Sequence, residues 1–195
     1  MSFYPADAVV PVELRTDHVL LRMLRADDVD LDYDAVVSSR AILWLRSDGG
    51  WPREGFTREE NLADLERHEA EHRERAAFTY TVMNPTETEC LGCVYIIPFT
   101  RLLERAGADE QLKAAVREDE AAVSFWVRQS RLADNLDRRL LPAVLPWFER
   151  DWAFSRVVYT ANRRETRQQD LYAAAGPRLL YSFTTTLVFA PTDKG

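Results

Sequence analysis

The chain has 195 residues, a formal net charge of -7, 46% hydrophobic residues and 29% charged residues. This length predicts one domain, over residues 1–195, and the composition is typical of a globular protein. An acidic chain argues against a general nucleic-acid or anionic-membrane binder, because such proteins present basic surfaces. The sequence contains no apolar run of transmembrane length and no secretory pattern at its start. We therefore expect a cytoplasmic protein without nucleic-acid or membrane partners.

The first third of the chain predicts a strand, a helix and a loop. Residues 18–24 alternate as in a strand, and residues 25–39 carry apolar side chains at helical spacing after an acidic start. Residues 47–55 form a loop by their glycine and proline content. Trp51 lies in that loop, either as the wall of a substrate site or packed onto the core.

The sequence HEAEH at residues 68–72 matches a zinc-protease motif, within a helix predicted to start at a capping box on Thr57 and to end near Arg75. Histidines four residues apart share a helix face and could bind zinc, with the glutamate as base. However, the surrounding residues are strongly charged, as in a solvated helix, and the only other histidine is His18. We therefore predict that the motif binds no metal.

Cys90 and Cys93 lie in the second arm of a hairpin predicted for residues 77–99. In a regular strand, residues three apart point to opposite faces, so we expect two buried thiols that neither form a disulfide nor share a metal. Residues 100–120 are predicted as a helical insertion between two central strands. This segment is either a lid over an acceptor site or an oligomer contact, and the latter would make the protein a homodimer.

The segment over residues 121–150 organises the chain. Residues 121–127 are almost wholly apolar, as in a strand covered on both faces, and apolar side chains recur at helical spacing from Leu132 onward. The first amides of such a helix are unpaired and its dipole is positive there, so the turn is an anion site with Arg128 and Arg131 at its mouth. Two prolines inside the helix predict a kink or break near Leu141.

Three patches of the sequence together resemble the GNAT N-acetyltransferases, in particular the branch of the ribosomal-protein N-terminal acetyltransferases. LRMLRADD at residues 21–28 resembles the start of that branch, and RLADNL at 131–136 resembles the R/Q-x-x-G-x-G/A turn that holds the pyrophosphate of acetyl-CoA. LYAAAGP at 171–177 resembles the L-Y-x-x-x-G-F end of the last family helix. Asp134 and Leu136 replace the two glycines of the turn, and Pro177 replaces the phenylalanine.

The resemblance implies an α/β fold with a mixed, mostly antiparallel central sheet flanked by helices, whose two central strands are parallel and splay apart at the cofactor cleft. It also implies transfer of an acetyl group from acetyl-CoA to a primary amine, on a small molecule or a protein N-terminus, by direct attack on the thioester. The alternative is a GNAT-like domain that has lost catalysis and acts as a binding or regulatory module. The replaced glycines favour that alternative.

The resemblance further implies the site residues. Tyr172 is the position from which many family members protonate the departing thiolate, and a tyrosine packed in the core is its alternative. Trp51 would contact the acceptor. For the base that takes the amine proton we select Glu120, against the alternative of a solvated carboxylate at a strand end. The expected cofactor contacts are Trp126, Val127, Arg128, Arg131, Ala133, Asp134, Asn135, Leu136 and Asn162.

Asp134 is expected to weaken cofactor binding, because a carboxylate beside a phosphate repels it. The same residue could act as the helix cap and take the backbone donors that a phosphate needs. Both roles oppose the cofactor.

Overall fold

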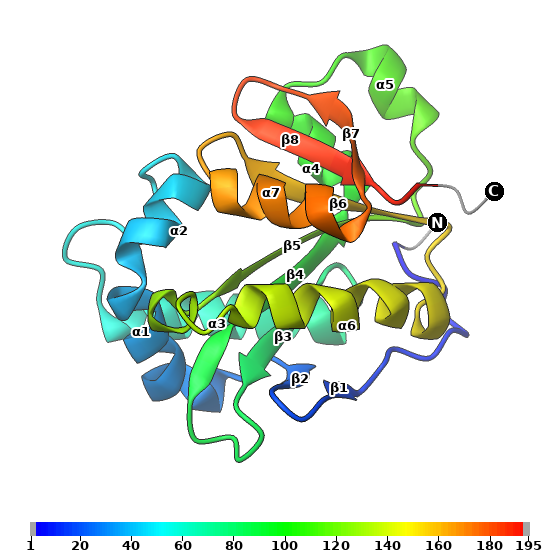
Figure 1. The fold of residues 1–195 in the computed structure, drawn as a ribbon. Coiled ribbons are helices and arrows are strands. Elements are labelled where there is room, and N and C mark those ends of the chain that lie inside the picture. The colour runs from blue at the N-terminus through cyan, green and yellow to red at the C-terminus, as the bar shows by residue number, and fades with distance from the viewer. Residues whose placement is uncertain (1–2, 193–195) are drawn as a thin grey trace.

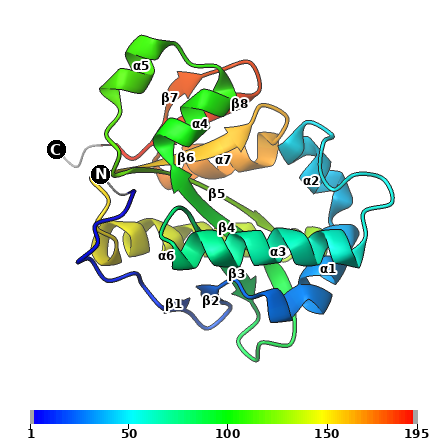
Figure 2. The ribbon, with the colours of Figure 1, turned by 180° about the vertical axis from the view of Figure 1, so that it is seen from behind.

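The computed structural model describes residues 3–192, which form an eight-stranded sheet with helices on both faces (Figures 1 and 2). The strands are β1 Glu13–Arg15, β2 Leu20–Met23, β3 Phe78–Met83, β4 Cys90–Pro98, β5 Glu120–Val127, β6 Arg156–Asn162, β7 Arg178–Ser182 and β8 Thr186–Ala190. The helices are α1 Val29–Ser38, α2 Arg40–Ser47, α3 Arg58–Arg73, α4 Phe99–Ala106, α5 Glu110–Ala115, α6 Leu136–Asp151 and α7 Thr166–Ala175, and short 3-10 turns cover Ala26–Asp28 and Gln129–Arg131.

The strand order is β1-β2-β3-β4-β5-β6-β8-β7, and each neighbouring pair is antiparallel except β5 and β6. This order confirms the predicted mixed, mostly antiparallel sheet with a parallel central pair. The parallel ladder joins Glu120–Val123 to Arg156–Tyr159, whereas the two strands continue to Val127 and Asn162. Beyond the last pair of the ladder the two strands therefore separate.

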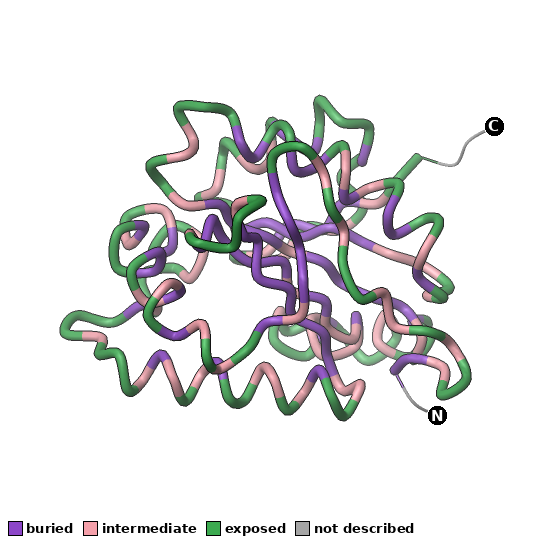
Figure 3. Tube along the Cα trace, turned by 90° about the horizontal axis from the view of Figure 1, so that it is seen from below, coloured by how far each residue is buried: buried purple, intermediate pink, exposed green. Residues whose placement is uncertain are grey.

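The helices are divided between the two faces of the sheet, and buried residues concentrate in the strands between them (Figure 3). On one face α6 and α7 pack through Val144, Trp147 and Tyr172 against the apolar side of the central strands. On the other face α1, α2 and α3 cover a second apolar cluster, and α4 packs beside them through Phe99 and Leu103. The segment predicted as helical over residues 100–120 contains α4 and α5.

A local sequence signal explains the start of α3, whereas packing explains the continuity of α6. Thr57 Oγ1 accepts from the Glu60 amide and Glu60 accepts from the Thr57 amide, so α3 starts at the predicted capping box. Helix α6 runs unbroken through Pro142 and Pro146, so of the kink or break predicted near Leu141 the break is wrong. Its apolar face is buried along its whole length, and this packing outweighs the hydrogen bonds lost at the prolines. None of the described helices is long and apolar enough to span a membrane.

Candidate active site

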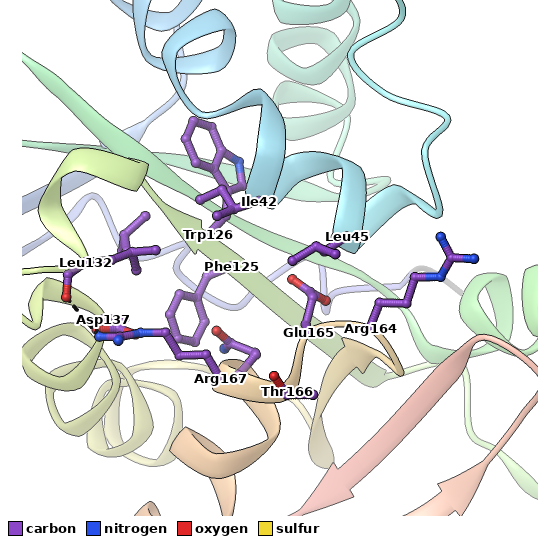
Figure 4. A pocket seen from close by; sticks show the side chains of 12 residues that line it. Ile42, Leu45, Phe125, Trp126, Leu132, Asp137, Arg164, Glu165, Thr166 and Arg167 are labelled. Atoms are coloured by element: carbon purple, nitrogen blue, oxygen red, sulfur yellow. Dashed lines mark hydrogen bonds and ion pairs between the residues drawn. The ribbon is translucent and has the colours of Figure 1, made fainter.

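A cleft opens where β5 and β6 separate, and four parts of the chain line it (Figure 4). Phe125 and Trp126 form its floor at the end of β5, and Ile42 and Leu45 reach toward it from α2. The remaining wall comes from the turn before α6 and from the start of α7, through Leu132, Asp137, Arg164, Glu165, Thr166, Arg167 and Gln168. The cleft between the separated strands thus has an apolar floor and a charged rim.

The turn that leads into α6 is longer than predicted. A 3-10 turn covers Gln129–Arg131 and the helix starts at Leu136, four residues after the predicted start at Leu132. Asn135 adopts the left-handed region with φ 55°, which asparagine tolerates better than most residues. The conformational freedom that a glycine would supply is therefore needed at Asn135, one position after Asp134.

The prediction that Asp134 caps α6 is wrong. Asn135 occupies the cap position without a capping side-chain hydrogen bond, so the first amides of the helix receive no cap from it. Asp134 is exposed, and its carboxylate lies 3.8 Å from the Arg131 guanidinium. Asp137 Oδ1 accepts from the Arg138 amide at 3.0 Å, so the first turn of α6 already uses one of the backbone donors that an anion site requires.

Arg128 and Arg131, the two arginines expected at the anion site, are both held by carboxylates. Arg128 Nη2 donates to Asp34 Oδ2 at 2.5 Å, and Arg131 Nη2 donates to Glu89 Oε2 at 2.5 Å. Glu89 also lies 3.6 Å from Arg128 Nη1. Arg131 lines a separate cavity on the side of the β3–β4 hairpin, and neither arginine lines the cleft. A phosphate would have to compete with these carboxylates for the two charges.

Sequence reasoning missed the basic side chains that line the cleft, Arg164 and Arg167. Arg167 donates to both carboxylate oxygens of Asp137, at 2.5 and 2.8 Å, and this pairing raises the pKa of Arg167. Asp137 is buried in the first turn of α6, where the helix dipole favours negative charge. The available signal was the basic sequence RRETR at residues 163–167, which follows directly on the second strand of the parallel pair.

A second cavity, of about 360 Å³, lies among α1, α2, α3 and β4. Trp126 connects the two spaces, because it lines the cleft while its Nε1 donates to the hydroxyl of Tyr95, which lines the second cavity, at 3.3 Å. Leu45 and Arg46 are adjacent on α2, and the first lines the cleft while the second lines the cavity. Arg46 lies 3.6 Å from Glu165 at the start of α7. The cleft and the cavity therefore meet around the open edge of β5.

The prediction that Cys90 and Cys93 point to opposite faces is wrong. Both thiols approach Asp32 Oδ1, at 3.8 and 3.7 Å. The β3–β4 register shifts by one residue at this point, and the intervening Gly92 has φ 143°, so the strand is not regular. A Cβ on Gly92 would lie 2.0 Å from the carbonyl oxygen of Trp126, so only glycine fits there. Burial raises the pKa of Asp32, which lines the second cavity.

Tyr172 lies in the interior, packed against Phe125 and Tyr159. Its hydroxyl donates to the carbonyl oxygen of Thr160 at 3.3 Å, and burial raises its pKa. Thr160 directly follows the last β6 residue of the parallel ladder, so the hydroxyl lies where the two strands begin to separate.

The structure does not bring Glu120 to this site. Glu120 starts β5, seven residues before Val127, which is about 23 Å along an extended strand. It is buried and forms an ion pair with Arg156 at 2.5 Å. Neither the predicted role as base nor the alternative of a solvated carboxylate describes it, and its role here is to neutralise Arg156.

The other residues expected at the cofactor contribute in different ways. Asn162 lies at the end of β6, where its amide donates to Glu165 Oε2 at 2.7 Å and its Oδ1 accepts from the Arg164 amide at 2.9 Å. It thereby shapes the loop before α7. Val127 lines the cleft, Ala133 is exposed in the turn, and the side chain of Leu136 is buried on the apolar face of α6. Trp51 lines the second cavity and packs edge-on against Phe56.

The two histidines of the HEAEH motif both contact Thr79 on β3, and Glu69 has other partners. His72 is buried and its Nδ1 lies 3.1 Å from the carbonyl oxygen and 3.3 Å from the amide nitrogen of Thr79, while His68 Nδ1 lies 3.2 Å from Thr79 Oγ1. Glu69 accepts from the Ala26 amide and from Arg73. Within residues 3–192, no group of three histidine, cysteine or acidic side chains is placed to hold a metal ion.

The sheet order, the separated parallel pair and the helix that starts beside it define the fold of the GNAT acetyltransferases. No family model and no curated protein matches the sequence. The ribosomal-protein-S5-alanine acetyltransferase of Vibrio fischeri matches the structure with a TM-score of 0.66 and 15% identity, over 94% of this chain and 98% of that one.

Two further solved structures agree. RimL, a ribosomal L7/L12 alpha-N-protein acetyltransferase in complex with coenzyme A, gives a TM-score of 0.68 and 15% identity, over 91% of this chain and 96% of its own. A GNAT-family acetyltransferase of Bordetella pertussis gives 0.66 and 16%, over 93% of this chain and 100% of its own. At these identities the likeness establishes the fold.

Proposed function

We propose that this chain is an acetyl-CoA-dependent N-acetyltransferase whose acceptor is the primary amine of a peptide or protein. The observation that carries the proposal is the cleft between the separated ends of β5 and β6, beside a helix start with no side-chain cap. Coenzyme A is bound in one solved neighbour, and the same neighbour acts on a protein α-amine by its printed name. A second cavity beside the cleft offers a place for the acceptor.

The cofactor would lie along the cleft, with its phosphates at the first amides of α6 and its thioester at the open edge of β5. The helix start supplies backbone donors, and Arg164 and Arg167 lie at the rim, where Arg164 pairs with Asp48 at 2.9 Å and Arg167 with Asp137 at 2.5 Å. The apolar floor of Phe125 and Trp126 would exclude water from the thioester.

In the transfer step the amine nitrogen attacks the thioester carbonyl carbon, the carbon–sulfur bond breaks and the amine loses one proton. Glu165 is the carboxylate that we assign to take this proton in place of Glu120, because it lines the cleft and pairs with Arg46 at the junction with the second cavity. Tyr172 is the proposed source of the proton for the thiolate, because its hydroxyl lies where the strands separate. Its side chain is fully buried and does not line the cleft, so this role requires a local opening of the core.

A domain that binds without catalysis is the second candidate. It is favoured by the carboxylates that hold the arginines near the helix start, namely Asp34, Glu89 and Asp137. Each would have to release its arginine before that charge could serve a phosphate.

One experiment separates the candidates. Purified protein is mixed with acetyl-CoA and short peptides with free N-termini, and release of the coenzyme A thiol is followed with a thiol reagent, beside a thermal-shift titration with acetyl-CoA. Thiol release above the protein-free rate supports the enzyme. Stabilisation by acetyl-CoA without thiol release supports a domain that keeps the cofactor but has lost catalysis, whereas the absence of both contradicts the enzyme and supports a domain that has also lost the cofactor.

A further inference from the structure

Two residues of the cleft wall adjoin Tyr172, the proposed proton donor. Phe125 lines the cleft, and its ring meets the Tyr172 ring edge-on with the centroids 6.2 Å apart. Gln168 also lines the cleft and lies four residues before Tyr172, which places the two side chains on one face of α7. Tyr172 itself has no exposed surface. A proton from its hydroxyl therefore reaches the cleft only if a covering side chain moves.

Of the two covering residues, Gln168 is the one at the reactive end of Tyr172. Burial raises the pKa of Tyr172, and the nearby Gln168 amide opposes this rise, as a donor that stabilises the phenolate does. The hydroxyl proton is directed to the carbonyl oxygen of Thr160, at 3.3 Å, which is long for an O–H donor. The contact of Phe125 is with the ring.

The Gln168 side chain is held loosely. Its Nε2 is buried and has no hydrogen-bond partner of ordinary geometry within residues 3–192. A buried donor without an acceptor is unfavourable, because it has lost water and gained nothing in return. The adjacent Gln169 provides the contrast, since its Nε2 donates to the carbonyl oxygens of Asn162 and Arg163 at 3.2 and 2.9 Å. The unbranched Gln168 side chain can therefore turn while α7 stays in place.

A ligand in the cleft would change the balance for Gln168. A carbonyl oxygen of the ligand could accept from Nε2 and so supply the partner that the free protein lacks. Phe125 gains nothing of this kind, because its ring carries no donor and belongs to the apolar floor. Gln168 is thus the covering side chain that a ligand would draw away from Tyr172.

We propose that Gln168 is a gate between the cleft and Tyr172. In the free protein its side chain covers the hydroxyl, and when the cofactor occupies the cleft it turns to donate to a carbonyl oxygen of that ligand. The Tyr172 O–H bond then breaks, the proton forms an S–H bond with the thiolate, and the phenolate regains a proton from solvent. The inference rests on the proposed function, and it makes Gln168 a positioning residue that acts through Tyr172.

Hydroxyl-radical footprinting of the ligand-free protein, read by peptide mass spectrometry, tests the cover without turnover. Gln168→Ala removes the covering amide, so we expect oxidation of Tyr172 to rise about tenfold over the wild type. Tyr159, which contacts Tyr172 in the same cluster, should stay protected in both proteins. Gln169→Ala is the matched control, because Gln169 does not line the cleft, and it should leave Tyr172 protected.

Gln168→Met separates a gate from a packing role. Methionine keeps the length of the side chain but removes the unpaired donor, so the melting temperature should rise by about 2 to 4 °C. Gln169→Met should lower it, because two hydrogen bonds are lost. The same change at Gln168 removes the group that a ligand attracts, so kcat should fall about tenfold, whereas Gln168→Ala should keep kcat within about threefold of the wild type.

The gate is overturned if Tyr172 stays protected in Gln168→Ala, or if Gln168→Met melts no higher than the wild type. A wild-type kcat in Gln168→Met also overturns it. If the footprint and the melting temperature change as expected while no thiol is released from acetyl-CoA, the covering role of Gln168 stands and the proposed activity fails. If the wild type releases thiol while Gln168→Ala leaves Tyr172 protected, the activity stands and the gate is contradicted.

Discussion

Arg46 Nη2 donates a 2.6 Å hydrogen bond to Ser124 Oγ, on the part of β5 that has separated from β6. The same guanidinium donates to the carbonyl oxygen of Phe125 at 3.1 Å and lies 3.6 Å from Glu165. One side chain of α2 thus connects the open strand edge to the start of α7. The cleft and the cavity beside it keep their relative positions partly through this residue.

We expect Arg46→Met to lower the free energy of unfolding by about 1 to 2 kcal/mol, because Ser124 and Phe125 lose charged donors in a partly buried place. Arg40→Met is the matched control, since Arg40 lies on the same helix with its guanidinium over the Trp44 ring, 4.6 Å from its centroid. Denaturant unfolding measures both. Equal losses in the two variants would contradict the role given to Arg46.

Glu89 accepts from Arg131 at 2.5 Å and lies 3.6 Å from Arg128. Its negative charge therefore pairs with both arginines, which would otherwise attract a phosphate. We expect Glu89→Gln to bind coenzyme A about three- to tenfold more tightly at low salt, and the gain should shrink as salt screens the charges. Glu87→Gln is the control, because Glu87 lies in the same hairpin turn but pairs with Arg22. A similar gain in both variants, measured by calorimetry, would show that only net charge matters.

The fold was predictable from the sequence because its signals are local and repeated. The buried run of β5 and the capping box of α3 each restrict the backbone in their own segment, and the structure uses both. The prolines of α6 led to the wrong prediction of a helix break. The hydrogen bonds lost at a proline can be read from the local sequence, but the packing of α6 on the sheet, which offsets them, depends on distant residues.

The site was less predictable because its charges pair across the fold. Arg131 could be placed at the mouth of a helix from the sequence, but its partner Glu89 lies 42 residues earlier. Glu120 was selected for its place before a central strand, and Arg156, which neutralises it, lies on the neighbouring strand. The sequence shows that Asp134 replaces a glycine of the family turn. The residue that adopts the left-handed conformation is nevertheless Asn135, and only the path of the backbone reveals this.

Glu120→Gln tests the ion pair at the start of β5. The variant should lose about 1 to 2 kcal/mol of stability, because Arg156 keeps its charge without its partner in a half-buried position. Its rate of acetyl transfer and the dependence of that rate on pH should stay those of the wild type. A shifted pH profile with unchanged stability would restore Glu120 as a catalytic base.

His68 makes stability depend on pH. Burial, together with the nearby Arg67, lowers the pKa of His68 from 6.5 to about 4. As pH falls from about 6.5 to about 4, this histidine becomes protonated in the unfolded chain but stays neutral in the folded chain. The free energy of unfolding therefore decreases through this window, by at most about 3 kcal/mol. His68→Gln should flatten that part of the profile, measured by chemical unfolding. His18→Gln, an exposed control, should leave it unchanged, and a flat profile in the wild type would contradict the burial of His68.

Tyr172→Phe tests the proposed proton donor. The hydroxyl donates to the carbonyl oxygen of Thr160, so its removal should cost about 1 kcal/mol of stability whatever its role in the reaction. If the hydroxyl also returns a proton to the thiolate, the variant should lower kcat about 100-fold while KM for acetyl-CoA changes little. Tyr159→Phe is the matched control, since that ring contacts Tyr172 in the same cluster. A fall in kcat of similar size in both variants, or none in Tyr172→Phe, would assign Tyr172 to packing alone and leave the protonation of the thiolate to solvent.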